Sequence, residues 1–205
     1  SAGPGAGAGA KSGGEGMAGP PVLILGETGT GKELIARALH FDGPRRDHPF
    51  IEVNCAALSS NLVESELFGH ERGAFTDARE RKPGLFQAAE GGTLFLDEIG
   101  ELPLPAQAKM LKAIEEKAIR PVGSVRDRRV DVRIVAATNA SVEGKARSGE
   151  CRSDLYYRLS TVSIVSPPLR ERGADVLVLA DAFLAAFRRR YERPDLAFDE
   201  AARAA

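Results

Sequence analysis

The sequence has few cysteines and no strong excess of either charge. Its two cysteines, Cys55 and Cys151, lie far apart in the 205 residues and lack the spacing of metal ligands. This pattern predicts free thiols in a reducing cytoplasm rather than a disulfide framework. The 28 Lys and Arg residues balance the 29 Asp and Glu residues to a formal net charge of −1. A protein that holds nucleic acid mainly by bulk charge is therefore not indicated.

Long hydrophobic runs and a leader segment are also missing. No apolar run approaches the roughly 18 residues that cross a bilayer, and the first residues lack the charged and apolar blocks of a secretion signal. We therefore expect a cytoplasmic protein without a membrane partner.

Histidine is scarce, and its positions do not suggest a metal site. His40, His48 and His70 lack zinc-ligand spacing, and no Ser, His and Asp set indicates a hydrolytic triad. We expect these histidines on surfaces or at helix caps. The basic stretch of residues 126–133 is interpreted as a solvated hairpin rather than a DNA-binding patch.

The chain divides into three parts. Residues 1–19 are predicted to form a flexible linker, because 8 of the 22 glycines lie in the first twenty residues and such a stretch has little apolar surface to offset its loss of entropy on ordering. Residues 20–172 are predicted to form an α/β core, and residues 173–205 the beginning of a helical lid that is truncated. A stripe of apolar residues with helical spacing, from Val176 to Phe187, precedes three arginines in this last part.

Short apolar runs alternate with segments of helical periodicity in the core, which is typical of a parallel sheet covered by helices. The predicted strands are residues 22–25, 50–53, 93–96, 132–136 and 162–165. Their apolar character favours strands that are buried on both faces. The predicted helices include residues 32–40 and 105–116.

A glycine-rich segment follows the first predicted strand and opens the first predicted helix. It reads Gly26, Glu27, Thr28, Gly29, Thr30, Gly31, Lys32 and Glu33. This is a phosphate-binding loop in the context that the motif requires, and the alternative is a turn without a ligand. Its N–H groups can surround an anion while Lys32 reaches the β- and γ-phosphates. We predict that these residues, with Leu34, bind ATP. Because Glu33 stands where a Ser or Thr usually binds Mg²⁺, that ion needs other ligands.

Two carboxylates, Asp97 and Glu98, follow the predicted strand of residues 93–96. Taken alone, this pattern is more often a solvated turn, but in a phosphate-loop fold the carboxyl end of this strand lies beside the phosphates. Asp97 can then bind Mg²⁺, and Glu98 can orient the attacking water. The adjacent acid favours ATP hydrolysis over a simple nucleotide switch.

Several further motifs follow in a fixed order. They occupy residues 53–56, 64–70, 73–78, 91–98, 137–139, 154–159 and 168–172. With the phosphate loop, they closely resemble the AAA+ ATPase domain of bacterial enhancer-binding proteins, the sigma-54-dependent transcription activators. The resemblance extends from about residue 21 to residue 172. It implies a ring, usually a hexamer, that binds ATP between neighbouring subunits and remodels sigma-54 RNA polymerase.

The resemblance also implies roles for individual residues. Asn54 is similar to the residue that pairs with the catalytic Glu98, and Asn139 to the sensor of the γ-phosphate; an isolated Asn at a strand end is otherwise a turn or cap residue. Arg152 and Arg158 match the arginines that a ring supplies to the neighbouring subunit's ATP, Arg158 more strongly. Either arginine could instead pair with an acid such as Asp154.

The contact with sigma-54 is implied for the loop of residues 71–78. Its contact residues are Gly73, Ala74, Phe75, Thr76, Asp77 and Ala78, with Phe75 and Thr76 at the tip. An exposed Phe between small neighbours suits a contact loop, although a lone Phe more often packs into its own domain. The family normally has glycine at the position of Asp77. We expect the Asp77 carboxylate to pair locally with Arg72 or Arg79.

Three functions remain open at this point. The leading interpretation is an ATP-hydrolysing activator of sigma-54 RNA polymerase that meets promoter DNA only indirectly. The second is a nucleotide-binding regulatory module that does not engage sigma-54 productively, because of Asp77 and an incomplete lid. The third, another AAA+ remodeller such as a chelatase or unfoldase subunit, leaves the loop of residues 73–78 unexplained. The sequence also leads us to expect a fragment of a larger regulator, without the family's helix before the first strand, its sensor arginine helix, its sensory domain or its DNA-binding domain.

Overall fold

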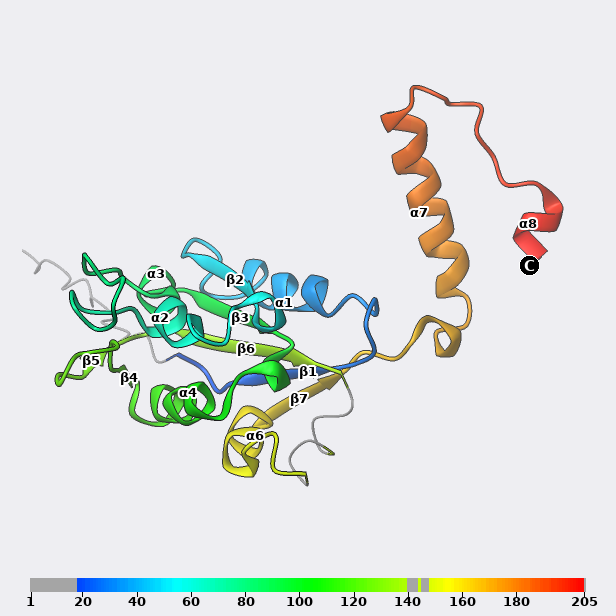
Figure 1. Ribbon diagram of the computed structural model, residues 1–205. Coiled ribbons are helices and arrows are strands. Elements are labelled where there is room, and N and C mark those ends of the chain that lie inside the picture. Colours follow the sequence, from blue (N-terminus) through cyan, green and yellow to red (C-terminus); the bar gives the residue numbers. More distant parts are fainter. Residues whose placement is uncertain (1–17, 140–143, 145–147, 205) are drawn as a thin grey trace, which may run out of the picture.

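The computed structural model describes residues 18–139, 144 and 148–204. Its centre is a five-stranded parallel sheet with the order β2-β3-β6-β1-β7 (Figure 1). The strands are β1 (Val22–Leu25), β2 (Phe50–Asn54), β3 (Thr93–Asp97), β6 (Arg133–Thr138) and β7 (Val162–Val165). The expected α/β architecture is confirmed, and all five predicted strands are present.

The helices also follow the predicted pattern. The helices of the core are α1 (Lys32–Phe41), α2 (Val63–Phe68), α3 (Leu85–Ala88), α4 (Leu104–Glu116) and α6 (Ser153–Leu159). Helix α4 begins with a proline in its first turn, where no intrahelical N–H partner is needed, and ends at Lys117, which adopts a left-handed conformation. A small antiparallel hairpin then pairs β4 (Ala118–Ile119) with β5 (Arg128–Arg129), which agrees with the hairpin expected for the basic stretch.

Side chains that alternate along the strands build two cores. Val22 and Ile24 of β1 face α1, where they pack with Ala36. Leu23 of the same strand belongs to the larger cluster on the opposite face, which α2, α3, α4 and α6 cover. Figure 1 shows α1 and α4 on opposite sides of the sheet. This alternation follows from the two-residue period of a strand.

Two of the strands depart from the expected burial. The central strands β1, β3 and β6 are buried on both faces, but β2 and β7 form the two edges of the sheet and are partly exposed. Glu52 of β2 and Ser163 of β7 interrupt their apolar patterns and mark these edges. The expectation of burial on both faces was therefore wrong for the two edge strands.

The histidine expectation was also wrong in part. His40 is fully buried at the end of α1 and His70 is 8% exposed, whereas only His48 lies on the surface. Both cysteine side chains are buried thiols. In the part of the chain that the structure describes, no helix is both long and apolar enough to cross a membrane.

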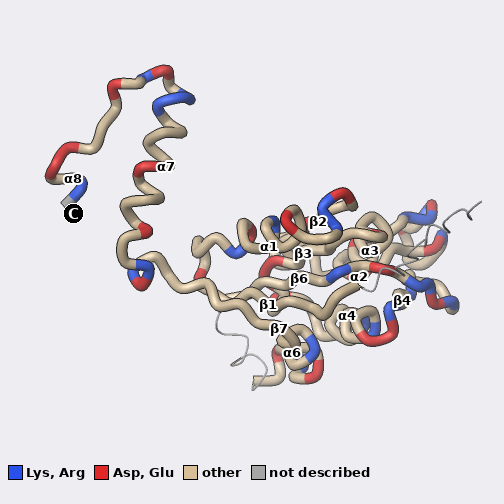
Figure 2. The backbone as a smooth tube through the Cα atoms, turned by 180° about the vertical axis from the view of Figure 1, so that it is seen from behind, with Lys and Arg blue, Asp and Glu red and all other residues tan. Residues whose placement is uncertain are grey.

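The C-terminal part consists of two helices, α7 (Asp175–Arg190) and α8 (Glu200–Ala204). Figure 1 shows α7 standing away from the sheet. Its last turn carries Arg188, Arg189 and Arg190, and Figure 2 shows this basic end far from the sheet. Apolar side chains of α7, among them Val178 and Phe183, are exposed. These helices agree with the expected beginning of a lid. The division of the chain at residues 19 and 172 stays a prediction, and most of the expected linker lies outside the described residues.

Candidate nucleotide site

The phosphate loop lies where β1 ends and α1 begins. Two of its glycines, Gly29 and Gly31, have φ angles of 83° and 86°, a left-handed conformation that glycine adopts without steric cost. Gly26 has no room for a side chain, because a Cβ atom there would lie 2.6 Å from the carbonyl oxygen of Ser166. Of the remaining loop residues, Glu27, Thr28 and Glu33 are exposed and Thr30 is partly buried; Leu34 on α1 is exposed.

Lys32 points back over the loop. Its Nζ donates hydrogen bonds to the carbonyl oxygens of Gly26 (3.0 Å) and Glu27 (3.1 Å), and the side chain is only 7% exposed. The same Nζ lies 3.9 Å from Oε1 of Glu98. A cation is thus placed between the loop and the acid that follows β3.

The two acids occupy the adjacent strand end. Asp97 is the last residue of β3, and its Oδ1 accepts the backbone N–H of Glu98 at 3.0 Å. Glu98 adopts φ 50° and ψ 51°, a left-handed conformation that is uncommon outside glycine and recurs at functional sites. Both carboxylates are partly exposed. Burial and these two charges together raise the pKa of the neighbouring Cys55 thiol to about 12.

The two predicted asparagines lie at the same edge of the sheet. Asn54 pairs with Asp97 in the register of β2 and β3, and Asn139 directly follows β6. The Oδ1 atom of Asn54 accepts the N–H of Ala56 at 2.9 Å and caps a short 3₁₀ turn. The cap function that sequence reasoning left open is therefore present at Asn54, and its amide nitrogen forms no hydrogen bond among the described residues.

Glu33, at the position that usually holds a hydroxyl for Mg²⁺, forms an ion pair instead. Its carboxylate lies 2.7 Å from Nε of Arg37, and the same guanidinium lies 2.8 Å from Glu52. Among the described residues, no group of three or more His, Cys, Asp or Glu side chains converges on one point as a metal cage would require.

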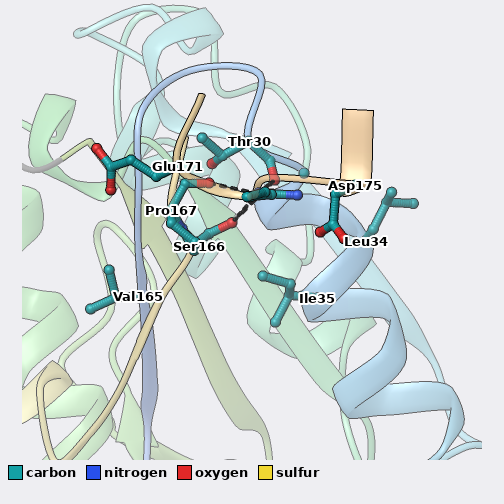
Figure 3. Close-up of a pocket in the computed structure, with 10 residues that line it drawn as sticks. Thr30, Leu34, Ile35, Val165, Ser166, Pro167, Glu171 and Asp175 are labelled. Atoms are coloured by element: carbon teal, nitrogen blue, oxygen red, sulfur yellow. Dashed lines mark hydrogen bonds between the residues drawn. The ribbon is translucent and has the colours of Figure 1, made fainter. Parts of the chain in front are cut away.

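A segment after β7, residues 166–172, lies over the phosphate loop. Arg172 donates to the Thr30 carbonyl oxygen and to Ser166 Oγ (3.0 Å), and Arg170 binds the Glu27 carboxylate through two hydrogen bonds of 2.9 and 2.6 Å. These bonds lower the pKa of the Glu27 carboxyl. A pocket of about 530 Å³ lies between this segment and the start of α1, and its lining includes Leu34, Ile35 and Val165 (Figure 3). Sequence reasoning assigned no role to either arginine, although both lie in a quoted motif.

The two arginines predicted to act on a neighbouring subunit are Arg152, which precedes α6, and Arg158, which lies in its last turn. Arg152 precedes the helix and forms two hydrogen bonds with Asp154, of 3.1 and 2.7 Å, which is the local pairing that sequence reasoning left open. Arg158 is exposed, and among the described residues its side chain forms no ion pair or hydrogen bond. An unpaired exposed guanidinium is free to reach another molecule.

The predicted contact loop follows α2 and is anchored at its base. The N–H of Gly73 donates to the carbonyl oxygen of Ala78 at 2.7 Å, and the ring centroid of Phe75 lies 4.9 Å from that of His70 in an edge-to-face arrangement. Phe75 is 37% exposed. Both alternatives for Phe75 are therefore met in part, since the ring contacts its own domain and still presents an edge to solvent. Thr76 and Asp77 beside it are exposed.

The expected pairing of Asp77 with a neighbouring arginine was wrong. Asp77 is exposed, and in the described part of the chain no ion pair joins it to Arg72 or Arg79. The ion pair at this loop instead joins Arg81 to Glu71 at 3.5 Å. The loop folds tightly, with the N–H of Arg79 donating to the Asp77 carbonyl oxygen, and this holds the Asp77 carboxylate in solvent.

Sequence reasoning also did not predict several polar side chains that are buried in the core. Gln107, His70 and Arg45 are all buried polar side chains. Arg45 lies 2.6 Å from Asp131 and also donates to the Gly92 carbonyl oxygen before β3. For Gln107 a signal was present, because it lies on the same helical face as Met110 and Ile114, and a polar residue on an apolar face indicates a buried hydrogen-bonding role.

The parallel sheet, the phosphate loop and the acids at the adjacent strand end define this chain as an AAA+ domain of the P-loop class. Residues 15–165 match the family described as the Sigma-54 interaction domain. The chain belongs to this family, which confirms the resemblance stated from the motifs.

Individual relatives agree with this assignment. The chain is 58% identical to the nitric oxide reductase transcription regulator NorR1 of Cupriavidus necator over 164 residues, which cover 80% of this chain and 32% of NorR1. It is 56% identical to the Nif-specific regulatory protein of Herbaspirillum seropedicae over 167 residues, 82% of this chain and 31% of that protein. The chain thus spans about a third of the length of these regulators. Among solved structures, NtrX from Brucella abortus in complex with ATP superposes with a TM-score of 0.81 and 33% identity, covering 88% of this chain and 39% of NtrX.

Proposed function

We propose that this chain binds ATP at the carboxyl edge of its sheet, hydrolyses it within a homo-oligomeric ring and thereby remodels sigma-54 RNA polymerase. The observation that carries the proposal is the meeting of the phosphate loop with the acids of β3, where Lys32 Nζ lies 3.9 Å from Glu98 Oε1. Family membership and the ATP complex of NtrX support it.

Lys32 and Glu98 divide the chemistry. Lys32 is bound to two loop carbonyl oxygens and needs only to turn its ammonium toward the β- and γ-phosphates to neutralise their charge. Glu98 acts on the attacking water, which it orients and polarises. Asn54 donates its amide to Glu98, and Asn139, at the end of the neighbouring strand, senses the γ-phosphate.

Mg²⁺ fits the donors at this edge. Asp97 offers a partly exposed carboxylate with one oxygen that has no protein partner among the described residues, and Mg²⁺ in such sites is usually held by one or two carboxylates together with substrate phosphates. Asp97 would bind the ion, which would neutralise charge on the phosphates when present. Glu33 is not assigned to the ion, because Arg37 occupies its carboxylate.

Hydrolysis is completed by a neighbouring subunit. Arg158 is exposed and unpaired in the described part of the chain, so it can reach the ATP of the next subunit in a ring and stabilise the charge on the transferred phosphoryl group. Arg152 can do the same only after it leaves Asp154. A hexamer is the expected ring.

The loop of residues 71–78 makes the contact with sigma-54 through Phe75 and Thr76. DNA is met only through the polymerase, and the reaction takes place in the cytoplasm.

One observation favours a second function, a regulatory module that binds nucleotide without engaging sigma-54. Asp77 is an exposed carboxylate beside the contact residues, and burying it unpaired at an interface would cost several kcal/mol, of order the whole affinity of a transient contact.

The experiment that tests the proposed chemistry compares Lys32→Ala with Glu98→Gln. We expect Lys32→Ala to lose ATP binding, because the ground-state phosphate charge is no longer neutralised. We expect Glu98→Gln to keep binding and to lose hydrolysis by about 100-fold or more. Binding is measured with a fluorescent ATP analogue and hydrolysis by phosphate release, with Lys112→Ala as the matched control on α4. Equal loss of binding in Lys32→Ala and Glu98→Gln would mean that Glu98 has a structural role only.

A further inference from the structure

Gln107 is a fully buried amide on the face of α4 that packs toward α6. The side chain has 0% exposure and lies on the same helical face as the buried residues Met110 and Ile114. Its Nε2 donates to the carbonyl oxygen of Leu102 at 2.7 Å and to that of Glu150 at 3.1 Å. Its Oε1 accepts the backbone N–H of Arg152 at 2.8 Å. Both donors and the acceptor of the amide are therefore used.

These three bonds join two segments with different proposed roles. Leu102 ends the short 3₁₀ turn that follows Glu98 on the same chain segment. Arg152 is the residue that precedes α6, the helix that carries Arg158. The sequence separations are 5 residues to Leu102 and 45 to Arg152, so Gln107 connects the acid-bearing segment with the arginine-bearing segment.

Only a carboxamide offers two donors and one acceptor in a plane. An apolar replacement would leave two carbonyl oxygens and one N–H without partners in a buried place, which is unfavourable for each group. The start of α6 could then relax. Helix α6 is short. Leu155 and Leu159 anchor it in the core, the Asp154 carboxylate accepts the Leu155 N–H, and Gln107 joins the residue that precedes its first turn to α4.

We propose that Gln107 is a positioning residue. It sets the direction in which the side chains of Arg152 and Arg158 project from the surface of the subunit. It touches neither nucleotide nor reacting atoms. It acts on the neighbouring subunit's ATP through the backbone of Arg152 and the orientation of α6. This inference rests on the proposed function, because it requires that the arginines act in trans.

The test uses Gln107→Met, which keeps the volume and removes all three hydrogen bonds. We expect kcat for ATP hydrolysis to fall about 100-fold, as a displacement of an ångström at a catalytic group can cause, while the affinity for ATP changes less than about twofold, because binding depends on the subunit's own loop. Gln87→Met on α3 is the matched control and should hydrolyse normally, since Gln87 forms no side-chain hydrogen bond in the described part of the chain. If Gln107→Met does not fold, Gln107→Leu replaces it, because Leu also removes all three hydrogen bonds and carries no buried charge.

Mixing experiments separate an effect in trans from one on the subunit's own acid. In a mixture with Glu98→Gln chains, a Gln107→Met site can receive correctly placed arginines from its neighbour, so hydrolysis should rise above the sum of the two separate rates. In a mixture with Arg158→Ala chains, no interface combines an intact acid with correctly placed arginines, so the rate should not rise. Suppose instead that the rate rises with Arg158→Ala chains and not with Glu98→Gln chains. Gln107 would then act on the Glu98 of its own subunit through Leu102, and the inference would be overturned. Normal hydrolysis by Gln107→Met, or any other pattern in the two mixtures, would also overturn it.

The failure of the proposed function looks different. The reference mixture contains Arg158→Ala and Glu98→Gln chains and no change at Gln107. If this mixture fails to recover activity while the unmodified chain hydrolyses ATP, the proposal that ATP is hydrolysed at a site shared between subunits is wrong. The inference about Gln107 is then wrong as well. If the reference mixture recovers and the Gln107→Met mixtures do not follow the expected pattern, the inference alone is wrong.

Discussion

At the scale of single residues, His40 of α1 is a buried polar side chain that packs against the sheet. Its Nδ1 lies 2.9 Å from Thr93 Oγ1, and its Nε2 has no hydrogen-bond partner in the described part of the chain. Burial lowers the pKa of this imidazole, and the nearby charge of Arg133 adds to the effect. His40 is therefore neutral in the folded chain under conditions in which an unfolded chain would begin to bind a proton.

This pKa direction predicts acid sensitivity. Below the ordinary histidine pKa of about 6.5 the unfolded chain binds a proton that the folded chain does not, so the free energy of unfolding should fall as the pH drops, with a slope for one proton of at most about 1.4 kcal/mol per pH unit. Urea unfolding between pH 5 and 8, a range around that value, measures the slope. His40→Gln should reduce it. An unchanged slope in His40→Gln would assign the sensitivity to other groups.

At the scale of elements, the contact loop is held by two neighbours, the end of α2 and the β4–β5 hairpin. The N–H of Glu71 donates to the Val122 carbonyl oxygen at 2.9 Å. Gly123 adopts φ 79°, and a side chain there would meet the Cβ of Ala74 at 2.8 Å. The hairpin and the loop thus lie in direct contact, and glycine is required at this approach.

The loop provides a prediction about partner binding that is separate from hydrolysis. We expect Phe75→Ala to abolish capture of sigma-54 in the presence of an ATP transition-state analogue, because the aromatic anchor is removed, while ATP hydrolysis stays within about twofold of the unmodified chain. Asp77→Gly should keep both hydrolysis and capture. Pull-down of purified sigma-54 measures capture, and Phe187→Ala on α7 serves as the aromatic control. Capture by Asp77→Gly but not by the unmodified chain would decide for the regulatory module.

The sequence predicted those elements whose local pattern and tertiary place agree. The strand–loop–helix of residues 22–41 was predicted to within one residue, because apolar residues, glycines and helix period coincide there. Burial of β2 and β7 was not predicted correctly, since edge position depends on strand order, which a single strand does not encode. The pairing of Asp77 failed for a related reason. Proximity in sequence to Arg72 and Arg79 does not fix side-chain direction in a tight loop, and Gln107 acquires its role only when residues 45 positions apart meet.

At the scale of the whole molecule, the site has an open side. The subunit supplies the phosphate loop, Asp97 and Glu98, whereas Arg158 lies on α6 with its side chain exposed. In the proposed function, Arg158 of a neighbouring subunit therefore adds to the subunit's own Lys32 in neutralising charge on the transferred phosphoryl group. Assembly of several chains is consequently part of the chemistry in this account, and the monomer alone should be nearly inactive.

The most direct test of this central claim is the rate of ATP hydrolysis per subunit, measured against protein concentration with and without sigma-54. We predict that the rate rises steeply with concentration as subunits associate and then reaches a plateau, and that Arg158→Ala chains bind ATP but stay near the dilute rate at every concentration. A rate per subunit that is constant across the range, with Arg158→Ala as active as the unmodified chain, would contradict hydrolysis at a shared site.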